Sequence, residues 1–230
     1  MNDNEEILKR IPLFRNLTNE QIAMLDKVVQ ERSYRRGRII FMEGEPGEAV
    51  FFVKTGRVKI SKQTDDGREY ILHFIHPGEI FAEVVLFGDE NYQATYPATA
   101  EVVEDCRVGM IRNNDMDRMI NENPGLALGL LKIMAARLRM AQRQINDLAL
   151  MDTTRRMVSM LLYLIAEQGI VTPEGIRIDM SLTNQDLANM IGASRETANR
   201  ILNDFRRQGA VEVDKQQIIV TNVRKLKSWL

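Results

Sequence analysis

One unbroken heptad pattern limits how this chain can fold more than any other feature. After Pro124, apolar side chains alternate by three and four positions at Leu131, Met134, Leu138, Ala141, Ile145 and Leu148. This is the spacing at which helices pack together as a coiled coil. Charged residues flank the apolar stripe at Lys132, Arg137, Arg139, Arg143 and Asp147. A helix buried inside one domain would be apolar on more than one face. We therefore expect residues 123–152 to form a long helix that joins two copies of the chain in a parallel homodimer.

The segment before this helix has the pattern of a β-rich domain. Short runs of β-branched and aromatic residues over residues 34–111 are separated by glycines, and Asp66-Gly67 is a strong hairpin signal. Many short strands with turn residues between them are typical of an antiparallel sandwich or jelly roll. Ahead of them, Thr18 and Gln21 form a capping box that predicts the start of a helix. We expect residues 1–122 to be a β jelly roll and the chain to be of the α+β class.

The segment after the long helix has the pattern of a helix-turn-helix followed by a β-hairpin. Thr183 can cap one helix that ends at Gly192, and Ser194 can cap the next. Two helices joined through a glycine turn are the sequence signature of a helix-turn-helix. Apolar residues alternate on both sides of Lys215, which predicts the hairpin of a wing. Residues 153–230 are therefore expected to form a winged helix-turn-helix.

The second helix of this pair carries the side chains that suit contact with double-stranded DNA. The first turns of a recognition helix reach base edges in the major groove, where arginine pairs with guanine and glutamate accepts from cytosine. Hydroxyl groups and the amides of a helix N-terminus can donate to phosphates. The alternative is a solvated helix face with an internal ion pair. The expected DNA-binding residues are Thr183, Ser194, Arg195, Glu196, Thr197, Asn199, Arg200 and Lys215.

Charge and composition restrict the function further. The net charge of −1 argues against binding nucleic acid over the whole surface, but residues 153–230 carry eleven cations and eight anions, a net +3 that leaves −4 on residues 1–152. No apolar run approaches the roughly 18 residues that cross a bilayer, and the acidic start lacks the layout of a signal peptide. Cys106 is the single cysteine, so one chain holds no disulfide or cysteine-ligated metal cluster, and a buried structural role is expected for it. We expect a cytoplasmic protein without a metal or cofactor.

At this point the chain resembles a known family over nearly its whole length, the CRP/FNR family of bacterial transcription regulators. The stretch Gly192-Ala193-Ser194-Arg195-Glu196-Thr197, with Arg200, resembles the catabolite activator branch, whose matching Arg, Glu and Arg read a TGTGA-type half-site. Asn199 replaces a glycine of that pattern. The runs 78–83 and 148–152 match the sensor core and hinge of the family. The resemblance implies a cytoplasmic homodimeric activator that contacts RNA polymerase, with a cyclic-nucleotide-binding-like jelly roll as sensor domain.

The sensor region departs from the cyclic-nucleotide pattern of the family. A cAMP-binding member would carry Gly-Glu and then Arg-Ser-Ala, but this chain has Ala82-Glu83 and Gln93-Ala94-Thr95. The Thr-Ser pair that would meet adenine is replaced by Ala141-Gln142. A buried phosphodiester without a cation is costly, so cAMP is not expected to bind. We expect a pocket for an unknown small-molecule effector, lined by Phe81, Ala82, Glu83, Gln93, Ala94, Thr95, Ala141 and Gln142.

Three other interpretations of the β-domain stay open to test. His73 or His76 could hold haem, but residues three apart on a strand face opposite sides, so the two are poor joint ligands. A metal-dependent barrel enzyme needs three or more inward-facing ligands, and the chain has only two histidines. A cyclic-nucleotide-binding module that controls another protein would leave the helix-turn-helix without a purpose. The sequence therefore predicts a DNA-binding regulator and not an enzyme.

Overall fold

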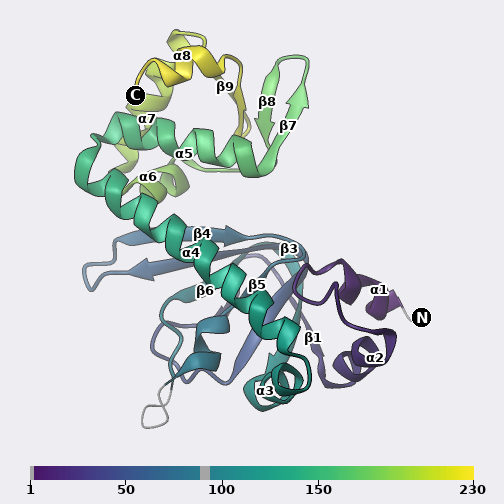
Figure 1. The fold of residues 1–230 in the computed structure, drawn as a ribbon. Helices are drawn as coiled ribbons and strands as arrows, with labels where there is room; N and C mark the ends of the chain where they lie inside the picture. Colours follow the sequence, from purple (N-terminus) through teal and green to yellow (C-terminus); the bar gives the residue numbers. More distant parts are fainter. Residues whose placement is uncertain (1–2, 89–93) are drawn as a thin grey trace. The chain divides into compact units, whose positions relative to one another are not determined.

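The computed structural model describes residues 3–88 and 94–230, which divide into two compact units. Of the described residues, the first unit comprises 3–62, 72–88 and 94–138, and the second comprises 63–71 and 139–230. The first unit is built around one antiparallel sheet in the order β1-β6-β3-β4, in which β2 also pairs with β6 and β5 with β3 (Figure 1). The strands are β1 (Gln30–Tyr34), β2 (Ile39–Phe41), β3 (Ala49–Gln63), β4 (Glu69–Ile75), β5 (Ile80–Phe81) and β6 (Thr99–Arg112). The antiparallel β-domain expected from the glycine-separated runs is confirmed.

An apolar core lies between the strands of this sheet and the helices at its end. Phe41 stacks on Tyr96 with ring centroids 3.8 Å apart, and the ring of Phe81 lies against Phe51. Gly109 faces the ring of Phe52, where a Cβ atom would come within 2.1 Å of the ring, so only glycine fits there without movement. Close packing of this kind fixes the sheet in one arrangement.

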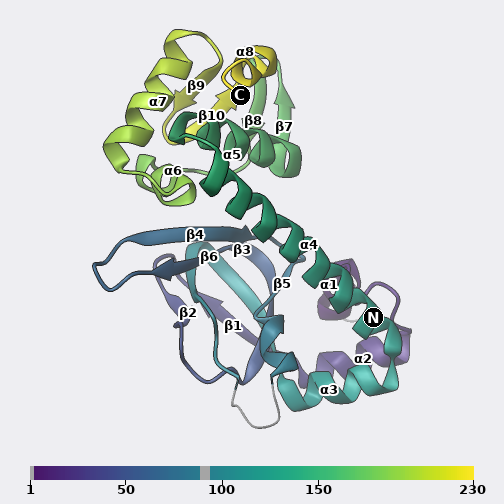
Figure 2. The ribbon, with the colours of Figure 1, turned by 60° about the vertical axis from the view of Figure 1, so that its left-hand side comes forward.

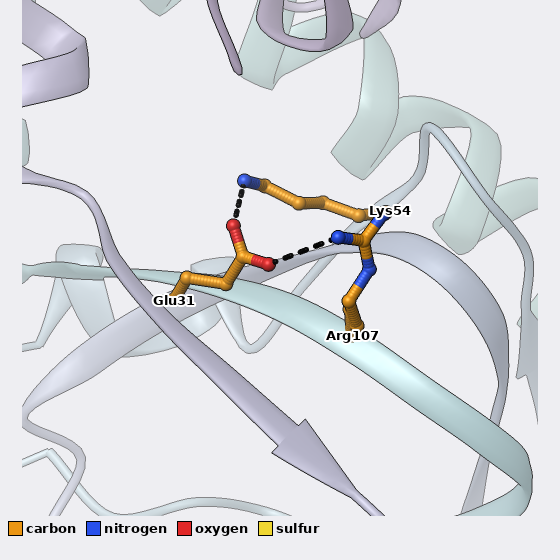
Figure 3. A network of polar contacts seen from close by, with 3 residues as sticks. All are labelled: Glu31, Lys54 and Arg107. Carbon is orange, nitrogen blue, oxygen red and sulfur yellow. Dashed lines mark hydrogen bonds and ion pairs between the residues drawn. The ribbon is translucent and has the colours of Figure 1, made fainter. Parts of the chain in front are cut away.

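Ion pairs add a second set of contacts between the strands. Lys54 of β3 has a side chain only 1% exposed and is paired with Glu31 of β1, which also lies 3.5 Å from Arg107 of β6 (Figure 3). Further along β3, Arg57 and Lys59 are paired with two glutamates of β6, Glu104 and Glu101. A buried cation needs such a partner, because an unpaired charge inside a protein is costly.

Three short helices gather at one end of the sheet, near the N-terminus (Figures 1 and 2). They are α1 (Asp3–Arg10), α2 (Asn19–Val28) and α3 (Asn113–Glu122), and a 3-10 helix, η1 (Glu83–Phe87), follows β5. The predicted capping box is present at the start of α2, where the Thr18 hydroxyl accepts from the Gln21 amide and the Gln21 side chain accepts from the Thr18 amide.

The predicted long helix is α4 (Pro124–Leu150). Its first half belongs to the first unit, where Leu126 and Leu130 are buried. The large seam residues Leu131, Leu138, Ile145 and Leu148 are 44–66% exposed in the single chain. An exposed apolar stripe along a helix is unusual for a surface that stays in water. Over the described residues, no helix is long and apolar enough to serve as a membrane span.

The second unit combines four helices with a four-stranded antiparallel sheet in the order β7-β8-β10-β9. The helices are α5 (Thr153–Gln168), α6 (Asn184–Ile191), α7 (Arg195–Arg207) and α8 (Val223–Lys227). The strands are β7 (Gly169–Thr172), β8 (Gly175–Ile178), β9 (Val211–Asp214) and β10 (Gln217–Val220). The predicted helix-turn-helix and wing are confirmed as α6, α7 and the β9–β10 hairpin, whereas the β7–β8 hairpin was not predicted.

Candidate nucleic-acid interface and sensor site

The turn between α6 and α7 is built from three local features of the sequence. Thr183 caps α6 and forms a capping box with Asp186, and Ser194 caps α7 by accepting from the Thr197 amide at 3.1 Å. Gly192 ends α6 with a left-handed φ of 62°, a conformation that costs glycine little. The hydroxyl groups of Thr183 and Ser194 are therefore engaged in capping, while the N-terminus of α7 stays open to an anion.

The two faces of α7 differ sharply. Ala198, Ile201, Leu202 and Phe205 are buried against the rest of the unit. Arg195, Glu196, Asn199 and Arg200 are all exposed on the opposite face. Within the described part of the chain, Arg195, Glu196 and Arg200 make no ion pair or side-chain hydrogen bond. The internal ion pair of the alternative interpretation is therefore absent from the described part of the chain, and these exposed groups are available to a partner.

The wing carries one further cation of the predicted set. Lys215 and Gln216 form the two-residue turn between β9 and β10, with φ values of 43° and 72°. Two positive φ values are the signature of the type I′ turn that suits the twist of a hairpin. Lys215 is exposed at this turn, where its ammonium group can reach a phosphate.

The end of α7 holds residues that the sequence analysis missed. A groove of about 720 Å³ is lined by Asn203, Arg206 and Arg207 of α7 and by Val211, Glu212 and Val213 of β9. Asn203, half-buried and four positions after Asn199, follows it by one turn on the same side of the helix. This helical spacing could have been read from the sequence.

In the first unit the predicted sensor residue Glu83 is paired with a cation of its own chain. Glu83 begins η1 with a side chain 0% exposed, and its Oε1 atom lies 2.9 Å from Nη1 of Arg137 on α4. The Nη2 atom of Arg137 donates to the Ile80 carbonyl at 2.5 Å. Burial raises the pKa of the Glu83 carboxyl, and the Arg137 guanidinium partly reverses this shift. Sequence analysis placed Arg137 only among the residues flanking the helix seam.

The other predicted sensor residues are distributed as follows. Ala82, at the position where the family pattern has glycine, adopts a left-handed φ of 63°. Phe81 is fully buried among aromatic rings, Ala94 is half-buried and Thr95 is exposed. Gln93 lies outside the described residues. Ala141 and Gln142 are exposed residues of α4 in the second unit.

The histidines and the cysteine have separate surroundings. Burial, with a smaller contribution from the charge of Arg137, lowers the pKa of His73 to about 3. His76 accepts a hydrogen bond on Nδ1 from Arg57 at 3.1 Å. Cys106 is buried, and burial together with the charge of Glu104 raises its pKa to about 12, which keeps the thiol protonated and unreactive. Over the described residues, no three His, Cys, Asp or Glu side chains gather as a metal site.

A winged helix-turn-helix with an open reading face, in one chain with an antiparallel β-domain and a long exposed seam, defines a class of DNA-binding regulators. Comparison with known families agrees, because residues 31–123 match the cyclic nucleotide-binding domain and residues 155–229 match the Crp-like helix-turn-helix domain. The chain belongs to the CRP/FNR family of DNA-binding transcription regulators. Its relatives are regulators and not enzymes.

Three relatives show how widely the family varies. The chain is 29% identical to a "CRP-like cAMP-activated global transcriptional regulator" of Mycobacterium tuberculosis, over 96% of this chain and 97% of the relative. It is 30% identical to the "Anaerobic regulatory protein" of Bacillus subtilis, over 90% and 86%. The structure of FixK2 from Bradyrhizobium japonicum is similar with a TM-score of 0.76 and 25% identity, over 88% of this chain and 97% of that one. The mycobacterial and the Bacillus relatives, at 29% and 30% identity, thus carry names that refer to different conditions, cAMP in one and anaerobic regulation in the other.

Proposed function

We propose that the protein acts as a homodimer that reads a palindrome with TGTGA-like and TCACA-like half-sites centred about one helical turn apart. The observation that carries this proposal is the exposed first part of α7, where Arg195, Glu196 and Arg200 have no partner within the described chain. Their residue types match those that read guanine and cytosine in the major groove.

The test is selection of bound sites from random DNA, followed by competition binding against every single-base variant of the selected half-site. Arg195→Ala and Arg200→Ala should each weaken binding by about 1–3 kcal/mol and relax the preference at one G·C pair. Glu196→Ala should loosen selectivity more than affinity. Lys215→Ala is the matched control, because loss of a phosphate contact weakens all sequences alike and flattens the salt dependence. Uniform losses for both arginine variants would show that the arginines touch only the backbone.

The dimer is proposed to form along α4. Four large apolar residues of the heptad seam are exposed in the single chain, and a second copy of the same helix would cover them. Leu138→Glu with Ile145→Glu would bring like charges together across the symmetry axis, so sedimentation should show a monomer at micromolar concentration. Leu150→Glu is the control, because Leu150 is 74% exposed but lies outside the seam. A double variant that stays dimeric would refute this interface.

Each of the three segments expected from the sequence is proposed to have its own role. Residues 1–122 form the sensor domain, residues 123–152 the dimerisation helix and residues 153–230 the DNA-binding domain. By resemblance to the family we assign activation of transcription through contact with RNA polymerase. Because its partner is chromosomal DNA, we place the protein in the cytoplasm.

We further propose that an unidentified small molecule, and not cAMP, is sensed near Glu83. Two observations support this: Gln93 stands where the family pattern has the phosphate-binding arginine, and the charge of Arg137 is already balanced by Glu83. Loss of a charge-assisted phosphate contact weakens binding by about 1.5–3 kcal/mol. The name of the mycobacterial relative favours the alternative of a cAMP-responsive protein. Titration calorimetry that gives a dissociation constant of a few micromolar for cAMP would establish that alternative, and a stoichiometric haem in purified protein would establish a haem sensor.

A further inference from the structure

A chain of side-chain amides runs along the exposed face of α7. Arg206 lies at its end, with Nη1 3.4 Å from Oδ1 of Asn203. The Nδ2 atom of Asn203 lies 3.4 Å from Oδ1 of Asn199, one turn earlier. Asn184, at the start of α6, brings its own Nδ2 atom to 3.1 Å from the same oxygen of Asn199. Three asparagines and one arginine thus connect the two helices of the helix-turn-helix.

The arginine determines which way each amide points. A guanidinium group can only donate hydrogen bonds, so the oxygen of Asn203 must face Arg206 and its nitrogen must face Asn199. The oxygen of Asn199 then accepts from Asn203 and from Asn184. A carbonyl oxygen has two lone pairs, and both are used by these two bonds. The part of the Asn199 amide left for another partner is its NH2 group, which can only donate.

Asn199 also occupies the right place to meet a base. It is exposed on the same face of α7 as Arg195, Glu196 and Arg200, within the turns that a recognition helix inserts into the major groove. A free asparagine amide pairs with adenine by accepting from N6 and donating to N7. That pair requires the oxygen, which is engaged here. Guanine presents two acceptors, O6 and N7, and suits a group that only donates.

We propose that Asn199 is a specificity-determining residue that offers only donors to DNA and therefore selects guanine over adenine at the base pair it faces. Asn184 and Asn203 are positioning residues that hold its amide in this orientation. This inference rests on the proposed function, because it requires that α7 reads base edges.

The first experiment locates the base pair. A palindrome is selected from random DNA with the full-length protein, and each position of one half-site is then varied. Asn199→Ala should reduce discrimination at a single base pair. At that pair, the unsubstituted protein should favour guanine over adenine by about 5- to 150-fold, the range for one well-placed base contact.

The second experiment reverses the amide. Asn203→Asp places an acceptor where Asn203 donates, so the NH2 group of Asn199 turns toward it and the oxygen becomes available for adenine. The guanine-to-adenine ratio at the located pair should fall by about tenfold or more. Asn184→Ala with Asn203→Ala should bring the ratio to about one, because the amide can then turn either way. Gln208→Ala is the control. It changes an exposed residue at the C-cap of α7 and should leave the ratio unchanged.

The guanine-to-adenine ratio distinguishes a change in base preference from a general loss of binding or stability, because a general loss weakens binding to all sequences alike. If Arg195→Ala and Asn199→Ala change no base preference, direct readout by α7 fails and this inference fails with it. If Asn199→Ala acts at one pair but adenine is preferred there, or the two positioning variants leave the ratio unchanged, the orientation of the amide is wrong while the proposed function stands.

Discussion

Removal of the Arg137 side chain should make the first unit strongly unstable at neutral pH and much less so in acid. Arg137→Met leaves Glu83, which is 0% exposed, without the cation 2.9 Å away. At an effective dielectric constant of about 20, that pair is worth about 6 kcal/mol if the carboxylate remains charged. Glu83 can instead take up a proton, and this costs less free energy than keeping an unpaired charge in the core. Protonation at pH 7 of a group with an ordinary pKa of 4.5 costs about 3.4 kcal/mol.

Protonation of Glu83 therefore determines how much unfolding free energy the variant loses. Protonation, with about 1 kcal/mol for the lost hydrogen bond to the Ile80 carbonyl, gives an upper limit of about 4–5 kcal/mol for the loss of unfolding free energy at pH 7. The loss stays below this limit because the raised pKa of Glu83 already costs the parent part of it. In the parent the folded pKa of Glu83 already lies above its ordinary value, and loss of the Arg137 charge raises this pKa further. Its contribution to stability is therefore fully present below pH 4.5 and is lost as the pH rises toward 7. The deficit of the variant should shrink to about 1 kcal/mol at pH 4.5.

Urea unfolding followed by circular dichroism at pH 7 and pH 4.5 measures both values. Trp229 is the single tryptophan and lies in the second unit, so its fluorescence reports a transition that the substitution should not move. Addition of Glu83→Gln to Arg137→Met should restore at least about 2 kcal/mol at pH 7, because no buried charge remains. Arg139 is an exposed arginine two positions after Arg137, and Arg139→Met should keep the unfolding free energy within about 0.5 kcal/mol of the parent. An equal deficit at both pH values, or a double variant no more stable than Arg137→Met, would refute the reasoning.

Three further predictions concern backbone strain and a buried histidine. Ala82→Gly should raise the unfolding free energy of the first unit by about 1 kcal/mol, measured by urea unfolding, because alanine at φ 63° is strained and glycine is not. Gln216→Gly should stabilise the second unit by about 0.5–1 kcal/mol in the Trp229 signal for the same reason, since Gln216 has φ 72°. His73 has a folded pKa of about 3 against an ordinary 6.5, so its contribution is present above pH 6.5 and is lost as the pH falls toward 3, by at most about 1.4 kcal/mol per pH unit. His73→Phe should flatten the pH dependence of stability in that range, and an unchanged slope would count against the buried neutral histidine.

The parts of the fold that were predicted depend on local rules. The heptad seam requires only spacing along one helix, and the helix-turn-helix requires only Thr183, Gly192 and Ser194 at the right intervals. Caps and positive-φ glycines act within a few residues, so the sequence displays them directly. The same holds for the wing, where apolar alternation surrounds a two-residue turn.

The parts that were missed depend on contacts between distant residues or on weaker patterns. Arg137 was assigned to the flank of the seam because periodicity identifies the face of a helix and not the partner 54 positions earlier in the chain. The β7–β8 hairpin was overlooked, although apolar residues surround Pro173-Glu174-Gly175, because its strands are short. Asn203 was not predicted, because its role comes from its contacts with Asn199 and Arg206 and not from its own residue type.

The ion pairs of β3 have a consequence for how the sheet assembles. From Ala49 to Val53 and from Arg57 to Ser61 the strand is buried without interruption, so apolar alternation alone does not distinguish one strand alignment from another two residues away. A shift by two residues would keep every side chain on its own face of the sheet. In one direction, however, such a shift would place Arg57 opposite Glu101 and leave Lys59 opposite Thr99. In the other direction it would place Lys59 opposite Glu104 and leave Arg57 opposite Arg107, so either shift leaves one buried cation without an acid. The buried charges therefore raise the free energy of misaligned strand pairings that the hydrophobic pattern alone would allow during folding.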